Sequence, residues 1–122
     1  MQLLSDSESI STRKVFIEVP CLSGDIEKSI MYARAALTDS LSVGEAPLIQ
    51  WLLYSQSLTL DIVDHKDRAI ILMLEFLWSA AADIIAVYMD FGITQEMRVA
   101  IKHAEMLGKN IEYRFIPDWD IV

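Results

Sequence analysis

The chain has 122 residues, of which 53% are hydrophobic, and its formal net charge at pH 7 is −8. This length fits one domain, and no apolar run reaches the roughly 18 residues of a membrane-spanning helix. The negative charge argues against binding to nucleic acid, which depends on clustered lysine and arginine. Cys21 has no second cysteine to pair with, and the N-terminus lacks a signal-peptide pattern, so we expect a cytoplasmic protein without membrane contact.

The first third of the chain predicts a tail followed by a strand and a helix. Residues 1–13 are rich in serine, aspartate and glutamate, which is typical of a flexible tail. We expect residues 14–122 to form a single α/β domain. Within it, residues 14–19 read KVFIEV, a β-branched and aromatic run typical of a strand. A loop of small residues then leads to Asp25, a good N-cap for a helix over residues 26–41.

The middle of the chain contains an unusually apolar helix. The apolar run at residues 48–54 predicts a strand that continues into a short helix, and Asp64 with Asp67 predicts the start of a long helix that ends near Ala82. That helix is apolar almost all round between residues 70 and 78. Such a helix is buried on both faces or covered by a partner. Because a small domain has little depth, we expect a homo-oligomer contact there; burial inside one subunit is the alternative.

The last third predicts a second strand and helix and then an edge strand. Residues 84–89 form an apolar run typical of a strand buried on both faces. Thr94 is a good N-cap, and the helix that follows ends at Gly108. Residues 110–115 alternate in polarity like an edge strand. Together these elements predict the α/β class, as a three-layer sandwich with a four- or five-stranded, mainly parallel sheet.

Three places carry candidate binding chemistry. The loop from Asp90 to Thr94 joins a strand end to a helix N-terminus, where α/β proteins bind ligands; the alternative is a simple turn and cap. Arg68 begins an apolar helix, so its guanidinium needs either a structural carboxylate or a ligand anion. Tyr54 and Gln56 offer hydroxyl and amide groups that suit a sugar or a base.

Other classes of site are not expected. His65 and His103 are far apart in the sequence, so no metal site is predicted. No glycine-rich phosphate loop occurs, which argues against a nucleoside triphosphatase or a classical dinucleotide enzyme. Cys21 is more typical of a small packed residue than of a nucleophile, since no histidine is placed near it by the sequence. We expect no cofactor.

Several motifs nevertheless indicate a family. They read VPCLSGD (19–25), YARAAL (32–37), GEAP (44–47), WLLYSQ (51–56), DRA (67–69), VYMDFGITQEM (87–97) and AEMLGKNIEYR (104–114). In this order and spacing, the pattern resembles the nucleoside 2-deoxyribosyltransferase-like superfamily, and most closely a small branch of uncharacterised phage and bacterial domains. The resemblance implies a Rossmann-like fold and a nucleoside or nucleotide ligand.

The departures from that family suggest that catalysis is lost. Active transferases carry a nucleophilic glutamate at the position of Ala100, and a methyl group cannot form a glycosyl ester. Glu96 replaces a glycine of the family loop, and Trp51 replaces a histidine. The resemblance therefore implies a non-catalytic nucleoside- or nucleotide-binding protein in which Trp51 stacks on a base. A phage protein of this kind would serve in anti-defence by sequestering a host nucleotide signal in the host cytoplasm.

Two alternatives remain open. A nucleoside glycosidase or deoxyribosyltransferase could use a relocated carboxylate from Asp83, Asp90 or Glu96, and an interaction module could dock through the apolar helix at residues 70–78. For the leading hypothesis, the predicted ligand-binding residues are Cys21, Ser23, Gly24, Asp25, Trp51, Tyr54, Gln56, Arg68, Asp90, Thr94 and Met97.

Overall fold

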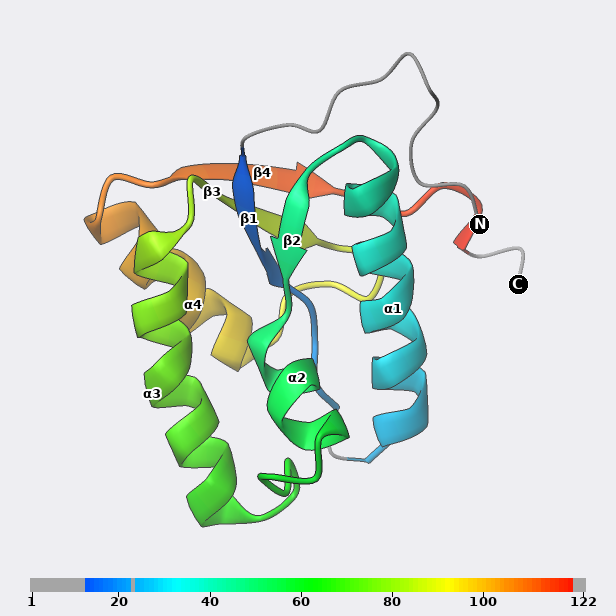
Figure 1. Cartoon of the computed structure of the whole chain (residues 1–122), viewed down its shortest axis with the longest axis vertical. Coiled ribbons are helices and arrows are strands. Elements are labelled where there is room, and N and C mark those ends of the chain that lie inside the picture. Colours follow the sequence, from blue (N-terminus) through cyan, green and yellow to red (C-terminus); the bar gives the residue numbers. More distant parts are fainter. Residues whose placement is uncertain (1–12, 23, 120–122) are drawn as a thin grey trace.

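A four-stranded parallel sheet forms the middle layer of the molecule, with helices on both sides (Figure 1). The structure is a computed structural model that describes residues 13–22 and 24–119. Its elements are β1 (Lys14–Glu18), α1 (Ile26–Ser42), β2 (Ala46–Leu48), α2 (Gln50–Gln56), α3 (His65–Ala81), β3 (Ile84–Tyr88), α4 (Gln95–Met106) and β4 (Asn110–Arg114). The strand order is β2-β1-β3-β4, and all three pairings are parallel. The predicted three-layer α/β sandwich is confirmed, with four strands.

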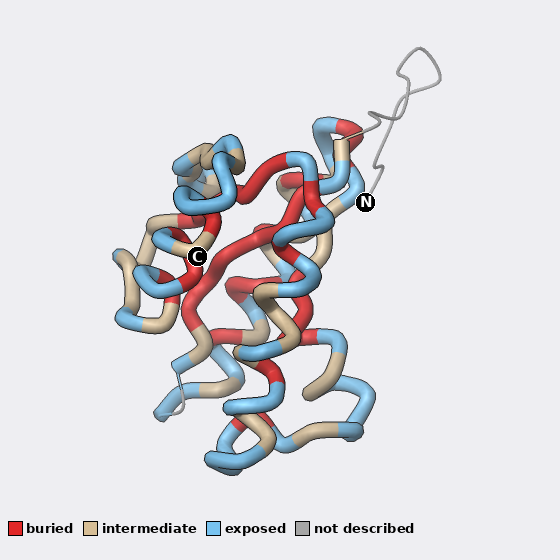
Figure 2. The backbone as a smooth tube through the Cα atoms, turned by 90° about the vertical axis from the view of Figure 1, so that its left-hand side faces the viewer, coloured by how far each residue is buried: buried red, intermediate tan, exposed pale blue. Residues whose placement is uncertain are grey.

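The sheet is buried because its two central strands are apolar on both faces. All five residues of β3 are buried, and Figure 2 shows the central strands as the most continuous buried part of the backbone. On β1, Val15 and Ile17 pack in one core cluster with Tyr32 of α1. Phe16 lies in the other cluster with Met97 of α4. The alternation along β1 therefore assigns odd-numbered residues to the α1 side and even-numbered residues to the α4 side.

Three helices begin at side chains that cap their first turn. Asp25 accepts from the backbone N–H of Lys28 at 3.1 Å, and Asp64 accepts from two backbone N–H groups at 3.0 and 3.1 Å. Thr94 accepts from the N–H of Met97 at 3.2 Å. The predicted N-caps are confirmed, since each side chain satisfies donors that have no partner within the helix. The predicted tail at residues 1–13 lies outside the described residues except for Arg13, which pairs with Glu112.

Helix α3 packs on α2 and α4 through one face and leaves the other face uncovered. It contacts both helices, and Ile71 is among its buried residues. On the opposite face Met73 is 69% exposed and Leu77 is 70% exposed. The alternative that this helix is buried on both faces within one subunit is therefore wrong. Among the residues that the structure describes, no helix is both long and apolar enough to span a membrane.

Candidate functional site

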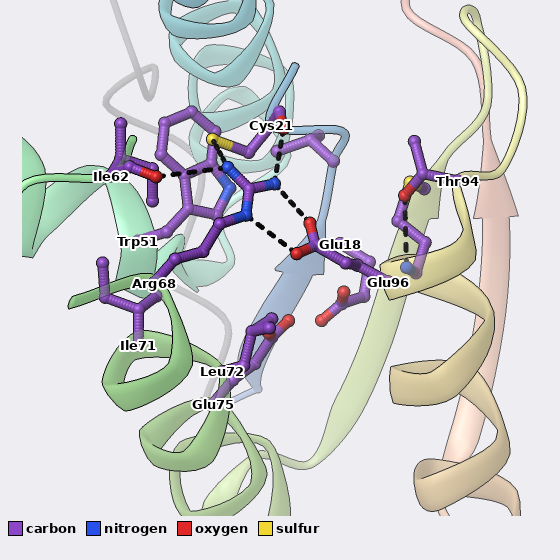
Figure 3. A pocket seen from close by; sticks show the side chains of 12 residues that line it. Glu18, Cys21, Trp51, Ile62, Arg68, Ile71, Leu72, Glu75, Thr94 and Glu96 are labelled. Atoms are coloured by element: carbon purple, nitrogen blue, oxygen red, sulfur yellow. Dashed lines mark hydrogen bonds and ion pairs between the residues drawn. The ribbon is translucent and has the colours of Figure 1, made fainter. Parts of the chain in front are cut away.

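The candidate site lies where β1 ends and where α3 and α4 begin. Its lining includes Glu18 at the end of β1, Cys21 in the next loop, Arg68 in the first turn of α3, and Thr94 and Glu96 at the start of α4 (Figure 3). Parallel strands end at the same edge of a sheet, and the adjoining helix N-termini start there. The fold thus brings together residues that are far apart in the sequence.

Arg68 lies at the centre of this site, and each nitrogen of its guanidinium group has hydrogen-bond partners. Its Nε donates to Glu96 at 2.8 Å, and its Nη2 donates to the second carboxylate oxygen of Glu96 and to the carbonyl of Cys21 at 2.7 Å. Its Nη1 faces the carbonyl of Ile62 at 3.3 Å and the sulfur of Cys21 at 3.7 Å. All five guanidinium hydrogens are therefore engaged. The sequence analysis left two roles open for Arg68, a structural ion pair and a contact to a ligand anion, and this conformation shows the ion pair. An anionic ligand would have to displace Glu96 to reach the guanidinium group.

A pair of carboxyl groups lies next to the ion pair. Burial raises the pKa of Glu18 well above its usual value, and the adjacent carboxyls of Glu75 and Glu96 add to that shift. The pKa of Glu75 is also raised, mainly by burial. Burial and the neighbouring carboxyl groups thus disfavour the ionised form of Glu18, and burial does the same for Glu75.

The space left inside this site is small and has polar atoms without partners. The cavity has a volume of about 20 Å³, which is room for about one water molecule. The indole nitrogen of Trp51 and one carboxyl oxygen of Glu18 are buried and have no hydrogen-bond partner. Trp51 is only 8% exposed and packs in the core, which corrects the expectation that its ring stacks on a base. What Trp51 can offer a ligand is its N–H group.

A larger groove adjoins the cavity between α3 and α4. It has a volume of about 260 Å³ and is walled mainly by apolar side chains, among them Leu72, Phe76 and Val99. It shares Glu75 and Glu96 with the cavity. The groove and the cavity therefore form one site with an apolar outer part and an acidic inner end.

Five of the predicted ligand-binding residues line this cavity. They are Cys21, Trp51, Arg68, Thr94 and Met97. Burial raises the pKa of the Cys21 thiol to about 11, so it stays protonated and is a poor nucleophile. Ala100, at the position where the transferases that the sequence resembles carry their nucleophile, lines the adjoining groove.

The other predicted residues serve the fold or lie elsewhere. Asp90 accepts from the Tyr32 hydroxyl and, at 3.0 Å, from the N–H of Ile116, so it fastens the chain after β3. Asp25 caps α1, and Gly24 before it is exposed. None of these three residues lines the cavity or the groove.

Tyr54 and Gln56 are also absent from the site, which corrects the expectation that they contact a ligand there. Tyr54 accepts from the indole nitrogen of Trp78 at 3.4 Å, and Gln56 accepts from Arg34 at 3.2 Å. Ser23 lies outside the described residues. In the described part of the chain, no group of histidine, cysteine and carboxylate side chains is arranged to hold a metal ion.

Glu18 is the site residue that the sequence interpretation missed. The signal was present, because a glutamate within the run KVFIEV must be buried if both faces of that strand are covered. Its position two residues after Phe16 assigns it to the α4 side of the sheet. The sequence also marked Glu75, though less clearly, because it is the single charged residue between residues 69 and 81.

Comparison with known protein families finds a match that covers most of the chain. A family model described as a domain of unknown function (DUF7768) matches residues 13–114. No curated protein and no solved structure matches the chain. The matched range includes every described residue of the cavity and the groove.

Proposed function

The chain belongs to the DUF7768 family of domains of unknown function, and we propose that it is a non-catalytic protein that binds a small nucleoside or nucleotide. The observation that carries the proposal is the convergence of five predicted residues, from four separate segments, on one cavity at the end of β1. In α/β proteins, this edge of the sheet is where ligands bind. In a phage, such a binder would sequester a host nucleotide signal.

The groove between α3 and α4 is the place for the ligand. Its volume of about 260 Å³ is close to the lower end of the range of about 300–1,000 Å³ found for small-molecule pockets. The apolar walls at Leu72, Phe76 and Val99 suit a base, and the polar inner end suits its hydrogen-bonding groups. A phosphate would meet the carboxylates of that inner end, so we expect nucleosides to bind at least as well as nucleotides.

The lack of a nucleophile at the expected position supports binding without turnover. Ala100 lines the groove with a methyl group, and the nearby Cys21 thiol is protonated at neutral pH because burial raises its pKa to about 11. Neither side chain can form a covalent intermediate with a sugar.

Calorimetry with nucleosides, nucleoside monophosphates, cyclic nucleotides and ADP-ribose tests the proposal. Ala100→Leu fills the groove, and we expect it to weaken binding at least tenfold. Ala80→Leu, at an exposed position on α3, is the matched control and should bind like the unchanged protein. If no compound in the panel binds to the unchanged protein, the proposal is wrong.

A second candidate function is a glycosidase or transferase with a relocated carboxylate. Glu96 precedes Ala100 by one helical turn, so the two share a helix face, and both line the groove. The other two candidate carboxylates already have hydrogen-bond donors. Asp83 accepts from the backbone N–H of Lys14 at the start of β1, and Asp90 accepts from the hydroxyl group of Tyr32. Chromatography of deoxynucleosides incubated with the protein decides this case: base release that Glu96→Gln abolishes would favour the enzyme over the binder.

We also propose that the chain forms a homo-oligomer through the uncovered face of α3. Four large apolar side chains are exposed on this helix: Ile70, Met73, Leu77 and Trp78. Contiguous apolar surface of this kind is typical of protein interfaces.

A further inference from the structure

The inner end of the groove has more acidic than basic residues. Figure 3 shows Glu18 from β1, Glu75 from α3 and Glu96 from α4 near one another. Among the described residues that line the cavity, Arg68 alone is basic, and those that line the groove include no basic residue. The guanidinium group of Arg68 is already paired with Glu96. The lining thus offers Glu18 and Glu75 no positive partner of their own.

The carboxyl group of Glu18 gives a second observation, because one of its oxygens is buried without a donor. Glu18 is only 4% exposed, and its Oε2 has no hydrogen-bond partner in the described part of the chain. Glu18 lines the cavity from the end of β1, behind the two glutamates of the helices. A buried acceptor without a donor is costly, so a ligand that brings a donor to this oxygen would remove that cost.

The groove beside these carboxyl groups can hold an apolar body. It has a volume of about 260 Å³, and its walls include Leu72, Phe76 and Val99. The face of an aromatic ring such as that of Phe76 also attracts cations. Glu75 and Glu96 line both the groove and the cavity, so the apolar part and the acidic part are continuous.

We propose that the groove binds an organic cation, with a positively charged nitrogen group on an apolar body, and that Glu75 selects the charge. The nitrogen group lies where the groove meets the cavity, beside Glu75 and Glu96, and directs a donor to the unpartnered oxygen of Glu18. Trp51 lines the cavity and not the groove. Its indole N–H is a donor and takes no part in holding the cation.

A positive charge fits this site better than a neutral group of the same shape. Burial raises the pKa of Glu18 and of Glu75, and neighbouring carboxyl groups add to both shifts. A positive nitrogen beside these carboxyl groups offsets that penalty by stabilising their ionised forms. Hydrogen bonds to ionised groups are also about twice as strong as those between neutral groups. A neutral ligand would gain only the burial of its apolar body.

The inference goes beyond the proposed function, because it specifies the charge of the ligand. Two sources share the required chemistry: a nucleoside with a positively charged base, and a simple aromatic amine. N1-methyladenosine carries a positive charge on its base, whereas the methyl group of N6-methyladenosine leaves the base neutral. Phenethylamine carries an ammonium group where phenethyl alcohol has a hydroxyl group.

Calorimetry at neutral pH with these two matched pairs tests the inference. In the pair that binds, we expect the charged member to bind about tenfold more tightly than its neutral partner, or better. Glu75→Gln keeps the size of the side chain and removes its charge, so it should abolish this preference. Glu105→Gln, an exposed change on α4, is the matched control and should leave it unchanged. Thermal unfolding of both variants shows that they are folded.

The outcomes separate this inference from the proposed function. Neutral ligands that bind as tightly as their charged partners, or a preference that Glu75→Gln leaves intact, overturn the inference; nucleoside binding can still hold. A preference for phenethylamine, with no binding of any nucleoside or nucleotide, supports the inference and overturns the proposed function. If none of the four ligands binds, the inference is wrong. The matched pairs test it on the unchanged protein, without any substitution.

Discussion

Glu18 shows how one residue can serve a site at a cost to the fold. Its side chain is 4% exposed, and burial raises its pKa well above the usual value. A carboxyl group with a raised pKa favours the folded state while it is protonated, and that contribution is lost as the pH rises through the folded-state pKa. Ordinary stability design would replace it with an apolar residue.

We predict that Glu18→Gln reduces a pH-dependent loss of stability. One extra proton bound by the folded state makes the free energy of unfolding fall by about 1.4 kcal/mol per pH unit. In the variant the raised pKa of Glu18 is gone while burial still raises the pKa of Glu75, so the fall should become smaller. Urea denaturation from pH 5 to 9 measures both slopes, with Glu105→Gln as the surface control. Parallel curves for the two proteins would show that Glu18 does not cause the fall.

At the scale of elements, local signals were predictable and long-range partners were not. Asp25, Asp64 and Thr94 cap helices within their own first turns, so the sequence alone was enough to predict them. Asp90 also follows a strand, but its partners Tyr32 and Ile116 are 58 and 26 residues away. The pattern that marked Asp90 as a ligand residue could not reveal that these distant groups already occupy it.

The same reasoning explains the misplaced residues of α2. Tyr54 and Gln56 lie on a helix of seven residues whose buried positions are all at its start. Their side chains therefore reach Trp78 and Arg34 instead of the cavity. The orientation of so short a helix is fixed by tertiary packing, which local sequence does not specify.

Asp90 gives a prediction at this scale because it joins three elements. Asp90→Ala leaves the buried Tyr32 hydroxyl and the N–H of Ile116 without their acceptor, so we expect a loss of about 1–3 kcal/mol in the free energy of unfolding. Ligand affinity should stay within about twofold, since Asp90 lines neither the cavity nor the groove. Denaturation and calorimetry on the same sample measure the two effects. A stable variant that has lost its ligand would reverse the conclusion about Asp90.

On the scale of the whole molecule, the parallel sheet with helices on both sides followed from the alternation of strands and helices, whereas the surface of α3 did not. The apolar pattern of this helix was equally consistent with burial and with a partner, because sequence periodicity does not say what covers a face. The structure leaves Met73 and Leu77 exposed on an acidic chain with a net charge of −8. Two such chains repel each other over long range, so any association has to come from apolar contact.

We therefore predict a homodimer that strengthens with salt, because screening removes repulsion and leaves apolar burial intact. Met73→Glu should shift the protein to monomers by placing a buried, unpaired charge at each contact. Met31→Glu is the matched control, since Met31 is 59% exposed on α1 and Met73 is 69% exposed on α3. Light scattering at low and high salt measures the mass. A monomer for the unchanged protein at both salt concentrations would contradict the dimer and leave the α3 face available to a different protein partner.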